Sequence, residues 1–183
     1  MEKFDHSLVA ATMRGYDQNN LFNFISTVIG KDEASRLMEM YCVGTSKHWN
    51  GATVFWQISA DGYVRGGKIM LYDRLTGHRV QAPYPHITWV HSALRMTDFR
   101  LNQCFFGEHL LPHIRDKPVA LVESEKTAIL ATHYMPQFLW LATGGKCSCM
   151  NRETIKSLQS REVILVPDLN ATDEWRKRMT IFD

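Results

Sequence analysis

Features that mark several protein classes are scarce in this sequence. Its 183 residues include only four cysteines at irregular spacing, which indicates neither a disulfide framework nor a pair of zinc knuckles. No apolar run approaches the roughly 18 residues that span a bilayer, and the N-terminus lacks an apolar core of signal-peptide length. We therefore expect a cytoplasmic protein with reduced thiols and no membrane partner. Cys147-Ser-Cys149 offers two zinc ligands, but its one-residue spacer and the lack of a second pair argue against a zinc site.

An excess of charge of one sign is also missing. The formal net charge is only +2, so no general basic field attracts nucleic acid, and any surface of that kind must be local. Apolar residues make up 45% of the chain, an ordinary share for a globular protein with a packed core. The length allows one domain or two small ones.

The last third of the chain contains three short apolar runs separated by segments with helical spacing. These runs are Val119–Val122, Phe138–Ala142 and Val163–Val166. The alternation predicts parallel strands joined by crossover helices. Glu123 and Asp168 follow the first and third runs, and ligands of open parallel sheets bind beyond the carboxyl ends of the strands. The two carboxylates are therefore candidates for one hard-cation site.

Two anion-binding features are expected beside these carboxylates. Ser124 suits the N-cap of a helix whose first amides and dipole favour a phosphate, and Lys126 would add a positive charge. Glu125, in the same turn, is more simply interpreted as a surface residue of the helix. The pair Gly144-Gly145 with Lys146 is either an anion-holding turn or a permissive connection.

Helical and strand signals of a different kind precede this region. We assign no element to residues 1–15. Apolar spacing from Asn20 predicts a short helix that Gly30 ends, and Asp32 is a candidate cap for a second helix. Residues 52–59 and 63–73 flank an Asp-Gly turn and predict a β-hairpin. The pair Gly66-Gly67 within it indicates a bulge or a close approach of the backbone to a ligand.

Basic residues cluster around the predicted hairpin. They are Lys47, His48, Arg65, Lys68, Arg74, His78 and Arg79. One interpretation is a solvated face of an antiparallel sheet. The other is a phosphate-binding surface for single-stranded nucleic acid, because Trp49 and Tyr72 stand among these cations. Under the second interpretation, Arg65 and Lys68 contact the phosphates.

Three segments of the C-terminal part resemble the motifs of Toprim domains, which occur in bacterial-type primases, topoisomerases and some nucleases. VESEKTA resembles the Glu-bearing first motif, LATGG the glycine turn after the second strand, and VPDLNA the Asp-x-Asp motif. The resemblance implies that Glu123 and Asp168 bind Mg²⁺ or Mn²⁺ during phosphoryl transfer. Asn170 stands where the family has its second Asp, and it would offer a neutral oxygen.

The preceding segments resemble the N-terminal part of primase catalytic cores. VFWQISADGYVRGGKIMLYD, WVHSAL and QCFFGEHLL follow one another in the family's order, as also in primase-like Toprim proteins of bacterial mobile elements, some of the Bacteroides type. The resemblance implies a primase-like part over residues 16–116 and a Toprim part over 117–183, with their boundary between Pro112 and Pro118. The implied partners are single-stranded DNA and nucleotides, with a helicase or a separate zinc-binding module as further candidates.

The sequence thus predicts an α/β protein: an α+β part with an antiparallel sheet, then a parallel βαβαβα part. The function implied is magnesium-dependent nucleotidyl or phosphoryl transfer on single-stranded DNA, in DNA replication or mobile-element maintenance. His91-Ser92 and Gln103-Cys104 depart from the primase pattern. With Asn170, these departures favour the alternative hypothesis of a catalytically weakened nucleic-acid-binding module. A Toprim nuclease is a third hypothesis. Toprim domains normally continue with another strand, so we expect a fragment or a trimmed version of the fold.

Overall fold

The computed structural model describes residues 3–145, 149–178 and 180 of the chain, which divides into two compact units. The first unit comprises residues 1–56 and 64–102, and the second comprises residues 57–63 and 103–183. The division after residue 102 lies before the Pro112–Pro118 connection at which the sequence suggests a boundary. Among the described residues, no helix is both long and apolar enough to cross a membrane.

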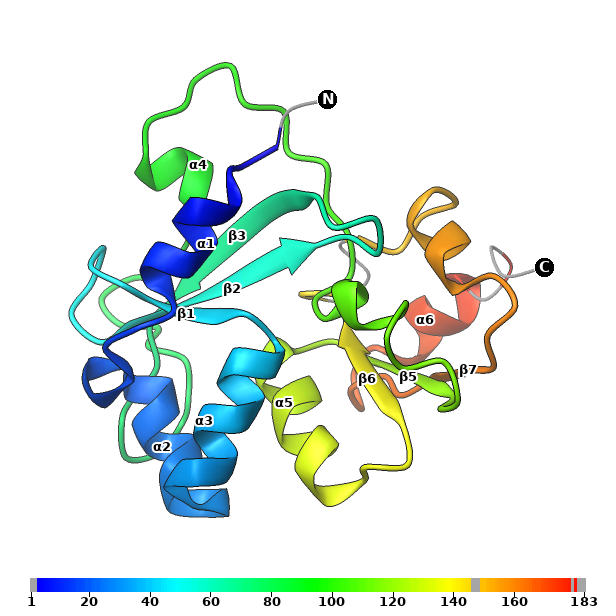
Figure 1. The fold of residues 1–183 in the computed structure, drawn as a ribbon, viewed down its shortest axis with the longest axis horizontal. Helices are drawn as coiled ribbons and strands as arrows, with labels where there is room; N and C mark the ends of the chain where they lie inside the picture. Colours follow the sequence, from blue (N-terminus) through cyan, green and yellow to red (C-terminus); the bar gives the residue numbers. More distant parts are fainter. Residues whose placement is uncertain (1–2, 146–148, 179, 181–183) are drawn as a thin grey trace. The chain divides into compact units, whose positions relative to one another are not determined.

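The first unit is built on a four-stranded sheet in the order β1-β2-β3-β4. Figure 1 labels the first three of these strands. Its strands are β1 (Val43–Ser46), β2 (Ala52–Ile58), β3 (Val64–Met70) and β4 (Ile87–Trp89), and the last two residues of β2 are assigned to the second unit. Its helices are α1 (His6–Thr12), the 3₁₀ turn η1 (Tyr16–Gln18), α2 (Asn20–Ile29), α3 (Lys31–Met40) and α4 (Val90–Ala93). Every residue of β2 is buried, which requires that both faces of this strand are covered.

The predicted pair of helices is confirmed, with one correction. Gly30 ends α2 with a positive φ of 88° and is also the N-cap of α3. Asp32, the predicted cap, instead lies in the first turn of α3, where its charge favours the helix dipole. Residues 1–15, to which the sequence assigned nothing, contain α1. The side chain of Asp5 caps this helix by accepting a hydrogen bond from the Ser7 amide at 2.7 Å.

Asn19 joins the start of α2 to the sheet. Its Oδ1 accepts hydrogen bonds from the Phe22 amide at 3.1 Å and from the Thr53 hydroxyl at 2.8 Å, while its Nδ2 donates to the Gly44 carbonyl at 3.2 Å. The side chain is fully buried. A buried amide of this kind contributes to stability only while its partners stay in place. Asn19 therefore fixes the position of the start of α2 relative to the sheet.

The β-hairpin is also confirmed. We expected a bulge or a close approach to a ligand at its paired glycines, and the structure shows a different role for Gly67. The strand β3 runs continuously through Gly66-Gly67. A Cβ at Gly67 would lie 2.7 Å from Val90 Cγ2 and 2.8 Å from Trp56 Cε3. The close approach at Gly67 is therefore to side chains of the same unit.

The second unit contains a three-stranded parallel sheet in the order β6-β5-β7. Its strands are β5 (Val119–Val122), β6 (Leu139–Ala142) and β7 (Val163–Leu165), which confirms the three predicted runs. Its helices are the 3₁₀ turn η2 (Glu108–Leu110), α5 (Glu125–Tyr134), the 3₁₀ helix η3 (Thr154–Leu158) and α6 (Thr172–Arg178). The mixed α/β class predicted from the sequence is confirmed.

The second crossover differs from the predicted α-helix, because its described helical part is η3. Asn151 Oδ1 accepts hydrogen bonds from the amides of Glu153 at 2.9 Å and Thr154 at 3.1 Å. Asn and Thr side chains that bind the nearby backbone compete with α-helical hydrogen bonds, which accounts for the tighter turn.

The segment before β5 is part of the second unit's core. Phe105 and Phe106 are fully buried, and the backbone of Phe106 pairs with that of Ala142 through hydrogen bonds of 2.9 and 3.1 Å. Arg161 Nη2 donates to the carbonyls of Ile114 at 2.8 Å and Lys117 at 2.6 Å. The polar connection predicted between Pro112 and Pro118 is thus bound to the start of β7. Cys42, Cys104 and Cys149 are thiols rather than disulfides, and Cys147 lies outside the described residues.

Gly67→Ala should destabilise the first unit, because the new methyl group would overlap Val90 and the Trp56 ring. Overpacking of a core typically costs about 1–3 kcal/mol, and we expect a loss of that size in the free energy of unfolding by urea. Ala10→Ser, at an exposed position of α1, is a control that alters one side chain outside the core. A Gly67→Ala protein as stable as the parent would show that the strand and helix can move apart at no cost.

Candidate functional site

The carboxyl ends of the three parallel strands form one edge of the second unit's sheet. Val122 is paired with Ala142, and Leu121 with Leu165. The Val166 amide then donates to the Leu121 carbonyl at 2.9 Å, and the Thr143 amide donates to the Val122 carbonyl at 2.9 Å. The residues that follow all three strands therefore start at the same level, as predicted from parallel geometry.

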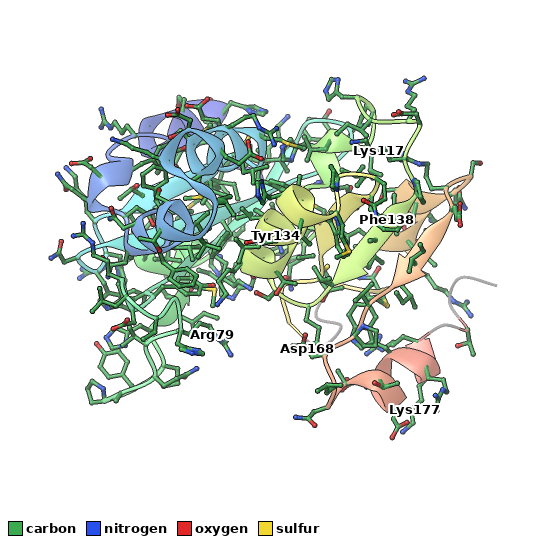
Figure 2. The ribbon with its side chains drawn as sticks, turned by 90° about the horizontal axis from the view of Figure 1, so that it is seen from below. Arg79, Lys117, Tyr134, Phe138, Asp168 and Lys177 are labelled. Carbon is green, nitrogen blue, oxygen red and sulfur yellow. The ribbon has the colours of Figure 1, made fainter. Side chains whose placement is uncertain are left out.

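Glu123 and Asp168 are brought together at this edge. The backbone amide of Asp168 donates to Glu123 Oε1 at 3.4 Å, although 45 residues separate the two along the chain. Glu123 is buried, whereas Asp168 is exposed where the chain leaves β7 for α6 (Figure 2). The amide of Ala171 donates to the Asp168 carbonyl at 2.9 Å, so the loop turns back immediately after Asp168.

The donors at this edge suit a hard cation that keeps part of its water shell. They are the carboxylates of Glu123 and Asp168 and the exposed amide of Asn170, two residues further on. Among the described residues, no three side chains of His, Cys, Asp and Glu are grouped to hold a metal ion. Glu123 and Asp168 offer two carboxylates, and Mg²⁺ is commonly bound by one or two carboxylates plus water.

The N-terminus of α5 lies directly after Glu123. The Ser124 side chain accepts a hydrogen bond from the Thr127 amide at 3.5 Å, which confirms it as the N-cap. Lys126 is half-buried in the first turn. Glu125 is only 3% exposed, so its interpretation as a surface residue of the helix was wrong. A third carboxylate, two residues after Glu123 in the sequence, is therefore buried.

The glycine turn after β6 is described as far as Gly145. Gly144 has a φ of 76°, in the left-handed region, and Thr143 before it is fully buried. Lys146, the predicted phosphate-binding residue of this turn, lies outside the described residues.

The two cations predicted on the hairpin do not share a face. Arg65 is half-buried, whereas Lys68 is only 4% exposed. Successive side chains of a strand point to opposite faces, so residues three apart on β3 lie on opposite sides of the sheet. The pair therefore cannot bind one phosphate track together from a single face. Both belong to the first unit, whereas Glu123 and Asp168 belong to the second.

One feature of the first unit, a cavity beside α1, was not predicted from the sequence. The helix α1 and the residues after it border a cavity of about 880 Å³ within the first unit. Asp5 followed by seven residues free of Gly and Pro was the available signal, but the segment has no clear apolar period.

Comparison with protein families gave one match. A family model described as a domain of unknown function (DUF6371) matches residues 19–169, which is most of the chain. The matched range begins at the buried Asn19 and ends one residue after Asp168, so it includes both carboxylates of the candidate site. A comparison with curated proteins found no match.

Replacing Arg65 and Lys68 one at a time should give different results. If Arg65 contacts a single strand, Arg65→Ala should weaken binding and reduce the salt slope by about 0.7, the value for one phosphate on single strands. Lys68→Ala should mainly lower the melting temperature, because a buried side chain is removed. Anisotropy of a labelled oligonucleotide across a salt series, beside thermal unfolding, measures both. An unchanged slope in Arg65→Ala would exclude the contact.

Proposed function

The chain belongs to the DUF6371 family, and we propose that it is a primase-like Toprim protein. In this proposal it acts on single-stranded DNA by magnesium-dependent nucleotidyl or phosphoryl transfer, in DNA replication or mobile-element maintenance in the cytoplasm. The observation that carries the proposal is the hydrogen bond from the Asp168 amide to Glu123 Oε1 at 3.4 Å. It supports a shared site for the two residues in which the sequence resembles the Toprim motifs.

Each residue of this edge has a separate task in the proposal. Glu123 and Asp168 hold the cation, and Asn170 adds an amide oxygen. A bound Mg²⁺ supplies charge neutralisation for a triphosphate and activation of an attacking hydroxyl. The first amides of α5 and the charge of Lys126 favour a phosphate group beside Glu123. The folded-back loop between β7 and α6 keeps Asp168 at the edge.

The second candidate is a catalytically weakened nucleic-acid-binding module. It is favoured by the donor set, because Asn170 carries no charge and Asp168 is exposed, so the cation is held by few ligands. A Toprim nuclease would use the same carboxylates on a phosphodiester, but the primase-like order of the preceding segments argues against it. If the chain is primase-like, a helicase or a separate zinc-binding module would select the template.

One incubation separates the three candidates. The protein is mixed with single-stranded DNA, nucleoside triphosphates and Mg²⁺ or Mn²⁺, and the products are resolved by length. We expect short new oligonucleotides, which Glu123→Gln and Asp168→Asn should abolish because each removes one negative charge with little change in shape. Shortened input DNA would indicate the nuclease, and a mobility shift without either product would indicate the binding module.

Metal affinity gives a prediction that does not depend on turnover. Asn170→Asp should tighten Mg²⁺ or Mn²⁺ binding, because it restores a charged ligand. Glu123→Gln should weaken binding by at least about tenfold, a loss that even outer ligands of metal sites can cause. The glutamine keeps an oxygen for the Asp168 amide, so the loop is retained while the charge is lost. Calorimetric titration of each variant measures these changes.

The control for this titration is Asp173→Ala. Asp173 is an exposed carboxylate in the first turn of α6, five residues after Asp168, and its ion pair with Arg176 at 3.5 Å lies on the surface. This variant should bind the cation like the parent protein. Equal affinity in all variants would mean that Glu123 and Asp168 are structural, and the proposed cation site would be abandoned.

A further inference from the structure

The cavity of about 880 Å³ in the first unit has the size of a site for one small ligand. It is bordered by α1 and the residues up to Gln18, by the loop between β1 and β2, and by α4. Its inner wall is formed by β2 and β3 through Val54, Trp56 and Ile69, which are themselves buried. Every residue that borders it is described and belongs to the first unit.

The inner wall has no polar group that needs a ligand. Trp56 Nε1 donates to the Thr12 hydroxyl at 2.9 Å, and that hydroxyl donates to the Val9 carbonyl at 2.8 Å. These internal hydrogen bonds leave an apolar wall without directional demands. Trp56 is fully buried and Val54 and Ile69 are nearly so, hence these residues form the floor beneath the cavity, and contacts to a ligand must come from the rim.

The rim of the cavity, unlike the apolar inner wall, is charged and polar. Arg14, Lys47 and His48 border the cavity and are exposed, and no acidic residue is among the described residues around it. Trp49, half-buried, borders the same cavity as the cations Arg14 and Lys47. Its ring centre lies 4.4 Å from that of His48 and 5.1 Å from that of His86, with steeply inclined planes. An aromatic surface next to cations suits a molecule that joins a flat ring to an anionic group.

Hydrogen bonds within the protein fix the backbone at the rim of the cavity. The Asn20 amide donates to the Gly51 carbonyl at 2.9 Å and the Ala52 amide to the Trp49 carbonyl at 3.0 Å, which closes the turn that carries Trp49. Next to Gly15, the Tyr16 hydroxyl donates to the Val43 carbonyl at 2.8 Å, which joins the residues after α1 to β1. Pre-formed sites lose less free energy to ordering on binding.

We propose that this cavity binds one nucleotide unit, with its base against Trp49 and its phosphate at Arg14, Lys47 and His48. The unit is either a free nucleoside phosphate or one residue of a single strand, because the same chemistry recognises both. Apolar and aromatic contacts do not read the edge of a base, so binding tolerates any base. The site uses no metal ion and none of the carboxylates of the second unit, and it therefore does not rest on the proposed function.

The test is calorimetric titration in EDTA, which removes metal-dependent binding from the measurement. AMP and CMP should bind with similar affinity. Adenosine, which lacks the phosphate, and ribose 5-phosphate, which lacks the base, should each bind at least about tenfold more weakly, since each loses one of the two contacts. A short oligothymidylate tests the other source of the unit. Tighter binding of the oligonucleotide would assign the site to a strand, and tighter binding of AMP to a free nucleotide.

Three variants tie the binding to the cavity. Trp49→Ala should weaken it by about fivefold or more, the lower limit for loss of a base–aromatic stack, while Trp49→Phe should retain most of it. Lys47→Ala, at an exposed position where misfolding is not expected, should weaken it and flatten its salt dependence. Lys31→Ala, an equal charge change on α3 away from the cavity, is the control. The proposal fails if neither AMP nor the oligonucleotide binds. It also fails if Trp49→Ala and Lys47→Ala, both correctly folded, bind as tightly as the parent and the control.

Discussion

The parallel pairing of β5 with strands on both of its sides is the constraint on which the second unit depends. The register aligns Val122 with Ala142 and Leu121 with Leu165, so the chain leaves all three strands at one edge. Glu123 and Asp168, which are far apart in sequence, meet there because their strands are parallel neighbours in this register. A strand reversed in direction would send Asp168 to the other end of the sheet, and the Glu123 carboxylate would then lack the amide that it accepts from.

The two units offer different chemistry. The second concentrates acidic groups at its sheet edge, with Glu123 and Glu125 buried and Asp168 exposed. The first concentrates cations and tryptophans around a cavity whose inner wall is apolar. Since the net charge of the chain is only +2, these local groupings decide what each unit can attract.

Burial separates the residues whose placement could be predicted from those whose placement could not. The meeting of Glu123 with Asp168 follows from strand order alone, and the sequence predicted it. The burial of Lys68 and Glu125 was not predictable, because it depends on which elements pack above β3 and the first turn of α5. Period-2 alternation places Arg65 and Lys68 on opposite faces of any strand, and their contacts with phosphates stay a prediction. Lys146 stays a prediction.

Local chemistry is what the sequence determined by itself: the Asp-Gly hairpin, Gly30 at the junction of α2 and α3, the Ser124 cap and the three apolar strands. Each depends on neighbouring residues and on backbone preferences. Tertiary structure alone decided the rest. The helix α1 docks where Gly44 leaves room for Thr12, and Gly67 leaves room for Trp56 and Val90. The cavity exists because elements distant in sequence pack around it, and such packing is a property of the assembled fold that no short pattern carries.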